Sequence, residues 1–535
     1  MSNVQLTEKD KTLLFWASFL SLLAAGVGFV FRVMIPTIWE TEFQITAAEV
    51  GGLTGTALWP IAVTMILFSL LVDKVGYRFS MICAFALQAL SVVLTVTATT
   101  VSGLWWACFC AGLGHGVVEA VINPLCASIY REEKSKWLNI LHAAWPAGIV
   151  IGGLAYIMFV GTDEALTWAD VKWVFWFMLA PVVAYGVLFL MCKRYPVDER
   201  VEAGVSYRDM LKEFGGLGIG LAATFLIYEL SGQLGINLGD NKLLICVAIG
   251  AGAGFAAGAA LKSKGKILFF VLCLIMIPLA TAELATDNWI QSLMRPIMGA
   301  ELAAWAIVLS ASIMMILRFF AGVPLRYMNP PQLLLLSSVF SIVGLFALSV
   351  TTGPAIFAAF VLYAIGQTFY WPTVLGFVSE QFPKGGAMTL NTVSAMGLLT
   401  VGIFGFPFLG AVKDSYSTKA IIDKEPALVE NVVANSTTFT DASDPENPVE
   451  KPIYEVKNFF GVDYEVINAG EFNKLPEMDE KRVEVLNGTL AGTSQSSLKV
   501  AAVLPAIMAL AFILIIIYYK AIGGYRPVVL GKEES

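Results

Sequence analysis

Charge and histidine are scarce in this 535-residue chain: charged side chains make up 14% of it, 2 residues are histidine, and 57% are hydrophobic. Such a composition excludes an ordinary soluble globular protein. With 34 Lys and Arg against 41 Asp and Glu, it also excludes the basic surface of a nucleic-acid-binding protein. Apolar runs long enough to cross a bilayer recur from end to end, whereas a β-barrel would show short alternating segments. The sequence therefore predicts an all-α polytopic membrane protein.

Motifs of enzymes and metal sites are also missing. The chain has no HExxH, GxSxG or GxxxxGK[ST] motif, and the glycine-rich run at 250–258 lies inside an expected span. The 7 cysteines fall in or beside expected spans without a CxxC pair, which indicates small buried side chains rather than disulfides or metal ligands. We therefore expect no enzymatic activity, no cofactor and no bound metal.

About 14 membrane spans are expected, in the order six, an extra pair and six. They lie at about 12–36, 47–71, 79–99, 103–130, 137–160, 172–192, 215–236, 242–261, 266–286, 300–324, 331–352, 354–379, 387–411 and 498–520. The polar N-terminus lacks a signal-peptide cleavage site, so the first span is expected to be retained. Short loops after even-numbered spans carry most of the Lys and Arg, which predicts that both termini are cytoplasmic. The protein is then a multi-pass protein of the inner (plasma) membrane.

This pattern divides the chain into five regions. They are a first six-helix bundle (1–200), a linker with an extra transmembrane hairpin (201–264), a second bundle (265–411 and 498–520), an extracytoplasmic insertion (412–497) and a cytoplasmic tail (521–535). The insertion is acidic and too long for an ordinary loop, so it is either a small cap over the outer mouth or a partly disordered tether. In the extra hairpin Gly250, Gly254 and Gly258 recur every fourth residue, as in closely packed helices.

A polar stripe interrupts the fourth span. His115, Glu119 and Asn123 are four residues apart, so on a helix they share one face. A carboxylate in a membrane span is costly and usually faces a bundle interior or a water-filled cavity. We interpret this stripe as the wall of a transport pathway.

A short loop carries the first resemblance to a known family. The segment DKVGYR at 73–78, directly after the second span, resembles the G-x-x-x-D-[RK]-x-G-[RK]-[RK] loop of the major facilitator superfamily, with Ser69 in place of the first glycine. The resemblance implies two six-helix bundles with a substrate site between them near the membrane midplane. It also implies that Asp73 and Arg78 act as a gate latch, although a solvated charged turn would account for the same residues.

Further motifs resemble the fucose:proton symporter branch of that superfamily. Its E-x-x-x-N-P motif is matched in the fourth span, and parts of its fifth-span, E-x-x-x-x-x-W and aromatic-Pro-Thr motifs are matched by Leu138-Asn139 with Gly148, Glu283 with Trp289, and Tyr370-Trp371-Pro372-Thr373. The chain departs from the branch in having Arg32 where the branch has Asp, and His142 and Trp145 where it has Gln and Asn. The substrate therefore need not be fucose, and the coupling can differ.

Site residues follow from these motifs and from the chemistry of their side chains. The expected proton-coupling residues are Glu119, Arg32 and His142. The expected substrate-binding residues are Asn123, Asn139, Trp145, Trp59, Glu283, Gln367, Tyr370, Trp371 and Asn391, because sugars stack on aromatics and bond to amides and carboxylates. Arg318, near the end of its span, is expected to snorkel to the membrane surface rather than to bind a ligand.

Several alternatives stay open. Arg32 could face Glu119 as an ion lock or as a static pair that joins two helices, and His115 could be a packing residue. The first functional hypothesis is proton-coupled symport of a sugar by alternating access, with a small-molecule substrate, protons and the lipid bilayer as partners, no nucleic acid, and a monomer as the working unit. The second is a uniporter or exchanger of an organic anion that uses Arg32. The third is a non-transporting sensor or scaffold that acts through 412–497.

Overall fold

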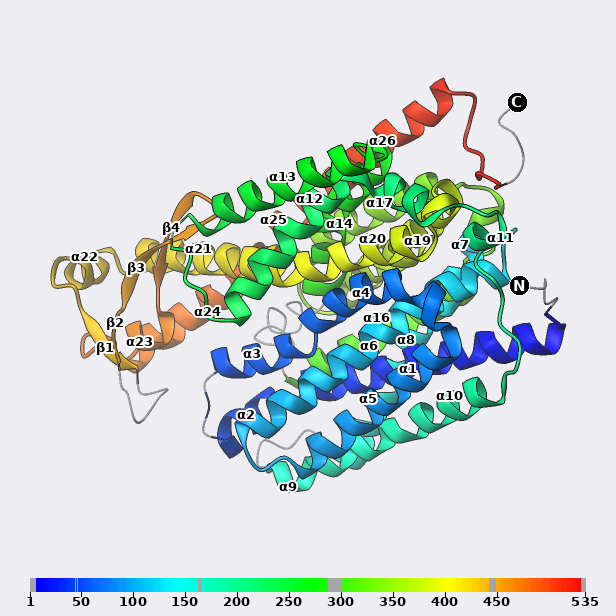
Figure 1. Ribbon diagram of the computed structural model, residues 1–535. Helices are drawn as coiled ribbons and strands as arrows, with labels where there is room; N and C mark the ends of the chain where they lie inside the picture. The colour runs from blue at the N-terminus through cyan, green and yellow to red at the C-terminus, as the bar shows by residue number, and fades with distance from the viewer. Residues whose placement is uncertain are drawn as a thin grey trace.

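The computed structural model describes residues 6–43, 45, 47–161, 166–239, 241–286, 300–441 and 449–530. Within these ranges 14 helical segments are long and apolar enough to cross a membrane, which confirms the all-α polytopic fold. Both ends of the described chain lie at one end of the bundle, which we call the terminal end (Figure 1). We call the opposite end, which carries residues 412–497, the insertion end. Trp289 falls outside the described residues, so its predicted role stays a prediction.

The first six spans form one half of the bundle, in the lower part of Figure 1. Its elements are α1 (Glu8–Met34), α2 (Pro36–Phe43), α3 (Ala47–Thr56), α4 (Trp59–Val75), α5 (Tyr77–Thr97), α6 (Val101–Ile129), α7 (Lys134–His142), α8 (Ala144–Phe159), α9 (Trp168–Val171), η1 (Lys172–Met178) and α10 (Leu179–Met191). A capping box between Thr7 and Asp10 starts α1. Helices α1 and α8 touch at Gly26 and Gly148, where a Cβ on Gly148 would come within 2.3 Å of a backbone oxygen of α1.

The second half of the bundle follows α11 (Glu199–Glu202) and the extra pair α12 (Tyr207–Gln233) and α13 (Lys242–Leu261). Its elements are α14 (Ile267–Ala280), η2 (Thr281–Ala285), α16 (Ala300–Phe319), η3 (Pro324–Arg326), α17 (Pro330–Leu348), α18 (Ala355–Gln367), α19 (Tyr370–Gln381), η4 (Pro383–Gly385), α20 (Gly386–Thr400), η5 (Val401–Gly405), α21 (Phe406–Lys424) and α26 (Val503–Ala521). The segments η2 and η5 are single π-helical turns. Such turns occur frequently at functional sites.

The extra pair packs through glycine, as the spacing at 250–258 predicts. A Cβ on Gly254 would come within 2.6 Å of the carbonyl oxygen of Gly216, and one on Gly216 would meet Gly254 in the same way. The two helices therefore approach backbone to backbone along this seam, which is possible only without side chains there.

The described part of 412–497 is a folded unit. Helix α21 runs out of the bundle to Lys424 and is followed by α22 (Pro426–Ala434), β1 (Thr438–Asp441), β2 (Val449–Pro452), β3 (Tyr454–Phe459), β4 (Val462–Ile467), α23 (Ala469–Phe472), α24 (Glu480–Ser496) and α25 (Leu498–Ala501). The strands form two antiparallel hairpins, β1 with β2 and β3 with β4. Buried side chains such as Ile421, Val432 and Phe472 give the unit a hydrophobic core separate from that of the bundle. The tip of β3–β4 places Phe459 and Phe460 against Phe404 of η5.

Candidate functional site between the two halves

Glu119 lies buried in the middle of α6, with 7% of its surface exposed. One carboxylate oxygen accepts a hydrogen bond from Nδ2 of Asn123 at 2.8 Å, and the other lies 3.6 Å from Nε2 of His115. The His115 ring is stacked on Trp145 of α8, with ring centres 5.2 Å apart and planes 18° from parallel. The structure thus brings the predicted stripe and Trp145 together around one carboxylate.

Asn123 links Glu119 to His142. Its Oδ1 lies 2.9 Å from Nε2 of His142, at the end of α7. Because an amide oxygen can only accept, this contact implies that Nε2 of His142 carries a proton. Asn123 is fully buried, and His142 is 3% exposed, so water does not compete for this contact.

Three backbone carbonyls near this cluster lack their ordinary helical donor, because a proline stands four residues later. The carbonyls are those of Ala120, His142 and Thr368, which precede Pro124, Pro146 and Pro372. Nδ2 of Asn391 donates to the Ala120 carbonyl at 3.0 Å. Arg318 serves the other two, with Nη1 to His142 at 3.0 Å and Nε to Thr368 at 2.6 Å. Two of these bonds join the halves of the bundle.

The prediction that Arg318 snorkels to the membrane surface is wrong. Its side chain is 2% exposed, and its Nη2 forms an ion pair with Oε1 of Glu283 at 2.7 Å. The orphaned carbonyls and this carboxylate together compensate the burial of the guanidinium. Arg318 is therefore the central cation of the site rather than a surface anchor.

Glu283 closes the chain of contacts in the second half. It lies in the π-helical turn η2, and its Oε2 accepts a hydrogen bond at 3.0 Å from the backbone N–H of Trp371, at the start of α19. Helix N-termini favour a negative charge. We name the connected set the central chain; it consists of His115, Glu119, Asn123, His142, Arg318 and Glu283.

Arg32 does not reach this chain. Its Nη1 donates to the Gly28 carbonyl of its own helix at 2.9 Å, and its guanidinium lies 5.9 Å from the ring centre of Phe175. It also lies beside Cys108, which stands eleven residues before Glu119, about 16 Å along the helix. The hypothesis that Arg32 and Glu119 face each other as an ion pair is therefore wrong for this conformation.

The other predicted substrate ligands are distributed around the central chain. Asn139 donates to Thr373 at 3.1 Å, and Gln367 donates to Ser310 at 3.2 Å. Tyr370 is fully buried. The remaining two are aromatic: Trp371 packs on Gly397, and the half-buried ring of Trp59 lies 5.7 Å from that of Phe109. Two of the predicted ligands contact the central chain or the helix that carries it. The backbone N–H of Trp371 donates to Glu283, and Asn391 donates to the Ala120 carbonyl of α6.

The predicted latch has a different partner. Asp73 forms an ion pair with Arg200 of α11, whereas Arg78 donates to the Leu190 carbonyl at 3.0 Å. Arg200 is 4% exposed and lies in α11, between the first half of the bundle and the extra pair. Asp73 and Arg78 therefore have separate partners, and their role as a gate latch stays a prediction.

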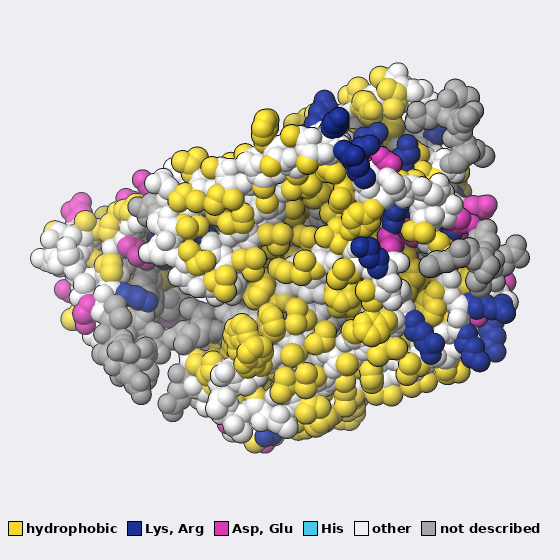
Figure 2. All heavy atoms as spheres, viewed as in Figure 1, with side chains coloured by type: hydrophobic (Ala, Val, Ile, Leu, Met, Phe, Trp, Pro, Cys, Tyr) yellow, Lys and Arg dark blue, Asp and Glu magenta, His cyan; other side chains and the backbone are white. Residues whose placement is uncertain are grey.

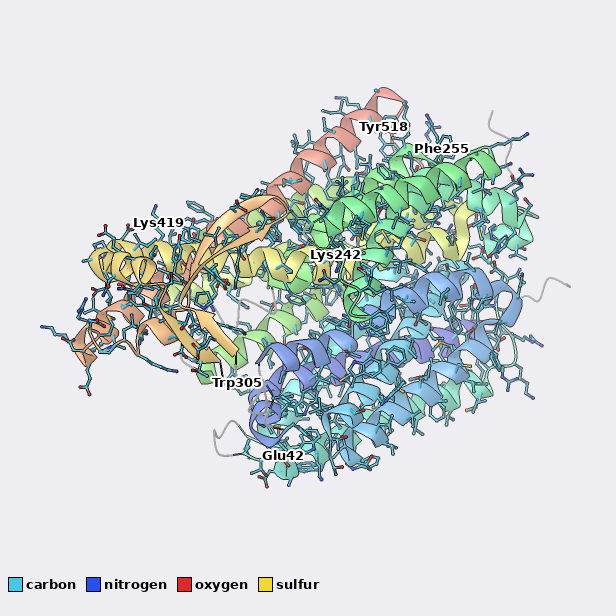
Figure 3. The ribbon with its side chains drawn as sticks, turned by 60° about the vertical axis from the view of Figure 1, so that its left-hand side comes forward. Glu42, Lys242, Phe255, Trp305, Lys419 and Tyr518 are labelled. Carbon is cyan, nitrogen blue, oxygen red and sulfur yellow. The ribbon has the colours of Figure 1, made fainter. Side chains whose placement is uncertain are left out.

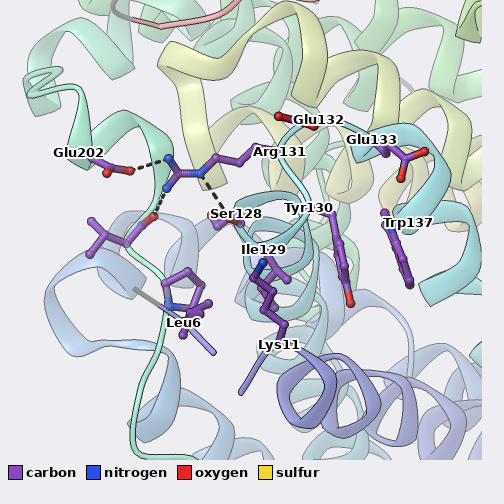
Figure 4. A pocket seen from close by; sticks show the side chains of 12 residues that line it. Leu6, Lys11, Ser128, Ile129, Tyr130, Arg131, Glu132, Glu133, Trp137 and Glu202 are labelled. Carbon is purple, nitrogen blue, oxygen red and sulfur yellow. Dashed lines mark hydrogen bonds and ion pairs between the residues drawn. The ribbon is translucent and has the colours of Figure 1, made fainter. Parts of the chain in front are cut away.

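Further contacts hold the two halves together at the terminal end. Lys134 of α7 forms an ion pair with Glu199 at 2.6 Å and donates to the Ser379 carbonyl of α19 at 3.2 Å. Ser135 donates to Glu380 of α19. Beside this seam, Arg131 binds Glu202 at 2.5 Å in a 650 Å³ surface pocket (Figure 4). The described contacts thus close this end of the interface.

A known family matches most of the chain up to the start of the insertion. The family description "Major Facilitator Superfamily" matches residues 14–411. The chain belongs to this superfamily. Among curated proteins, a gentisate transporter of Corynebacterium glutamicum is 23% identical over 169 residues, which are 31% of this chain. That alignment spans 37% of the gentisate transporter, well under two thirds of its length.

Solved structures of this superfamily share the fold. A proton:xylose symporter bound to 6-bromo-6-deoxy-D-glucose has a TM-score of 0.57 at 13% identity, covering 78% of this chain and 91% of that one. The fucose:proton symporter of E. coli has a TM-score of 0.55 at 14% identity, covering 76% and 92%. A bacterial homolog of the human lysosomal transporter Spinster, solved in an inward-facing conformation, has a TM-score of 0.55 at 14% identity, covering 95% and 97%. At such identities these likenesses show the fold.

A proline-specific double-mutant cycle tests the orphaned carbonyl at Ala120. Asn391→Leu should lower the free energy of unfolding by about 1–2 kcal/mol, because the Ala120 carbonyl then has no donor. In a Pro124→Ala background the restored backbone N–H can take that carbonyl, so the same change should cost less. Thermal unfolding in detergent measures both values. Pro146→Ala is the control background. If it lowers the cost of Asn391→Leu as much as Pro124→Ala does, Asn391 does not act through the Ala120 carbonyl.

Asp198, at the terminal end, is expected to make the stability of the folded protein depend on pH. Burial, followed by the nearby Asp73 carboxylate, raises the pKa of Asp198 from 3.8 to about 6. Between these two pH values the folded protein therefore binds more protons than the unfolded chain, so this residue lowers stability as pH rises toward 7. Asp198→Asn should remove a decrease on the order of 1 kcal/mol between pH 5 and pH 7, and the amide can still cap the Arg200 N–H. Melting curves at both pH values check this, with the exposed Asp209→Asn as control. A wild-type decrease that persists in Asp198→Asn would contradict it.

Proposed function

We propose that this superfamily member is a proton-coupled symporter of a small polar solute, most simply a sugar, which works by alternating access in an inner (plasma) membrane. The observation that carries the proposal is the central chain, which places a buried carboxylate on each half and joins the halves through Arg318. A membrane anchor has no use for such costly buried groups, which argues against the sensor hypothesis based on 412–497.

Glu119 is the proposed proton site. It has no Lys or Arg within ion-pair distance among the described residues, and its neighbours are His115 and Asn123. A carboxyl in this setting can exist as the neutral acid or as the anion, and a solute that binds better to one form is thereby linked to the proton. His142, bonded to Asn123, completes the proposed coupling group.

A sugar is favoured by the surroundings of this carboxylate. The ring of the half-buried Trp145 stacks on His115, whose partner Glu119 is bonded to the amide of Asn123, and aromatic rings with a few polar groups are the usual form of such a site. Proteins described as proton:xylose and fucose:proton symporters share the fold. In this proposal the terminal end is the cytoplasmic one, so the conformation is closed toward the cytoplasm.

An organic anion is the second candidate substrate. The partial likeness to a gentisate transporter favours it. Arg32, the predicted anion ligand, packs inside the first half, so Arg318 is the cation of the central chain that an anion could approach. In the binding step, a substrate carboxylate would replace the Glu283 carboxylate as the ion-pair partner of Arg318.

Uptake into proteoliposomes separates the two candidates. Labelled monosaccharides, disaccharides and aromatic carboxylates are offered to the reconstituted protein with an acidic exterior. The proposal predicts that one sugar accumulates and that a protonophore abolishes the accumulation. Accumulation of a carboxylate and of no sugar would reject the sugar and select the second candidate, whose dependence on Arg318 is then tested.

A further inference from the structure

An apolar groove runs along the extra pair. It encloses 890 Å³ and is lined by Leu217 and Leu221 of α12, Val247, Ala251 and Phe255 of α13, and Phe270 of α14. Phe255 is 82% exposed and projects from the outer surface of the bundle (Figure 3). Helix α13 is also the least buried of the spans in the described chain, at 17%. The groove therefore opens toward the bilayer rather than toward the central chain.

The groove follows from the glycine seam. Gly220 and Gly250 face each other where the helices touch, and a Cβ on Gly250 would come within 2.7 Å of the Gly220 carbonyl oxygen. Because these positions carry no side chains, longer side chains farther out, such as Leu217 and Phe255, form the rims of a hollow.

Two lysines mark one end of the groove. Lys262 and Lys264, in the loop after α13, line it and are exposed. Within the described chain neither forms an ion pair with a carboxylate. Figure 2 shows Lys and Arg side chains over this end of the extra pair, next to a largely hydrophobic surface.

The loop that carries these lysines is fixed in place. Gly215, with φ +59°, breaks α12, and the N–H groups after the break bond to the loop instead of to their own helix. Gly216 donates to the Ser263 carbonyl at 3.1 Å, and Leu217 donates to the Lys264 carbonyl at 3.0 Å. The backbone that carries the two lysines is therefore held at this end of the groove.

We propose that this groove binds one anionic phospholipid, with its acyl chain against α12 and α13 and its phosphate between Lys262 and Lys264. Apolar walls within the membrane, ended by unpaired cations at its surface, have the charge pattern of such a lipid. The opposite end of α13 does not offer an equivalent site, since Lys242 there lies 4.1 Å from the ring centre of Tyr228. The inference is independent of the proposed transport substrate.

Native mass spectrometry of the full-length protein in detergent tests this site. Phosphatidylglycerol and phosphatidylcholine with identical acyl chains are titrated onto wild type, Lys262→Gln/Lys264→Gln, Ala251→Trp and the control Lys520→Gln. Lys520 is an exposed lysine at the same end of the bundle, on α26. Melting temperatures confirm that each variant is folded.

We expect wild type and Lys520→Gln to bind the first phosphatidylglycerol about tenfold more tightly than phosphatidylcholine, and Lys262→Gln/Lys264→Gln to lose this preference. Ala251→Trp, which fills the groove, should weaken both lipids. Equal binding of both lipids by wild type, an equal loss in Lys520→Gln, unchanged binding in Ala251→Trp, or dimers in place of the lipid adduct would each overturn the proposal.

Discussion

Arg318→Gln should abolish transport and lower the free energy of unfolding by about 3 kcal/mol. The substitution leaves Glu283 buried without its ion partner and removes the donors that serve the carbonyls of His142 and Thr368. An uncompensated buried charge costs more than the pair itself contributes. Melting in detergent and uptake in proteoliposomes measure the two losses.

The matched control is Arg326→Gln, because Arg326 is exposed in the turn η3 just beyond the same helix. It should change neither quantity. Removing both charges with Arg318→Met/Glu283→Gln should restore part of the stability but not transport, which would separate folding from function. If Arg318→Gln is as stable and active as the control, the central chain is not the site.

Glu119→Gln should abolish proton-driven accumulation while leaving exchange of the solute across the membrane. A glutamine imitates the protonated acid, so the variant can bind and carry solute but cannot release the proton that commits the cycle. We expect accumulation at a fixed pH gradient to fall by more than about tenfold, and exchange between preloaded and external solute to change less. Both are measured on the same vesicles.

Glu229→Gln provides the comparison, since Glu229 is a carboxylate of the extra pair that accepts a hydrogen bond from Gln233 at 3.0 Å. It should keep both activities. Equal loss of exchange and accumulation in Glu119→Gln would assign Glu119 to solute binding alone, and retention of both would remove it from the site.

The periodicity of the fourth span was sufficient to predict which of its polar side chains lie on one face. His115, Glu119 and Asn123 share a helical face by spacing alone, and the structure brings them together. Arg318 was mispredicted because its place near the end of an apolar run is also typical of a snorkelling side chain. Its partner Glu283 lies in another helix, and spacing carries no information about contacts between helices.

A signal for Arg318 and Asn391 was nevertheless present in the sequence. Every proline inside a helix leaves a carbonyl without a donor four residues earlier, and such groups need partners within a membrane. Pro124, Pro146 and Pro372 thus predict three buried acceptors. Which side chains serve them depends on how the two halves meet, and that is visible only in the structure.

The latch and the insertion show two other limits. The loop motif contains Asp73 but has no position for its ion-pair partner Arg200, which comes from α11. The insertion carries no long apolar run, so its separate core around Phe472 follows from many short contacts that no single motif predicts.

The central claim is most directly tested by the pH inside proteoliposomes that carry a pH-sensitive dye and the wild-type protein, when each candidate sugar is added outside without an imposed gradient. Our account predicts that one sugar acidifies the interior as it enters and that the others do not. Entry of that sugar without acidification would contradict proton coupling at the central chain and leave a facilitator.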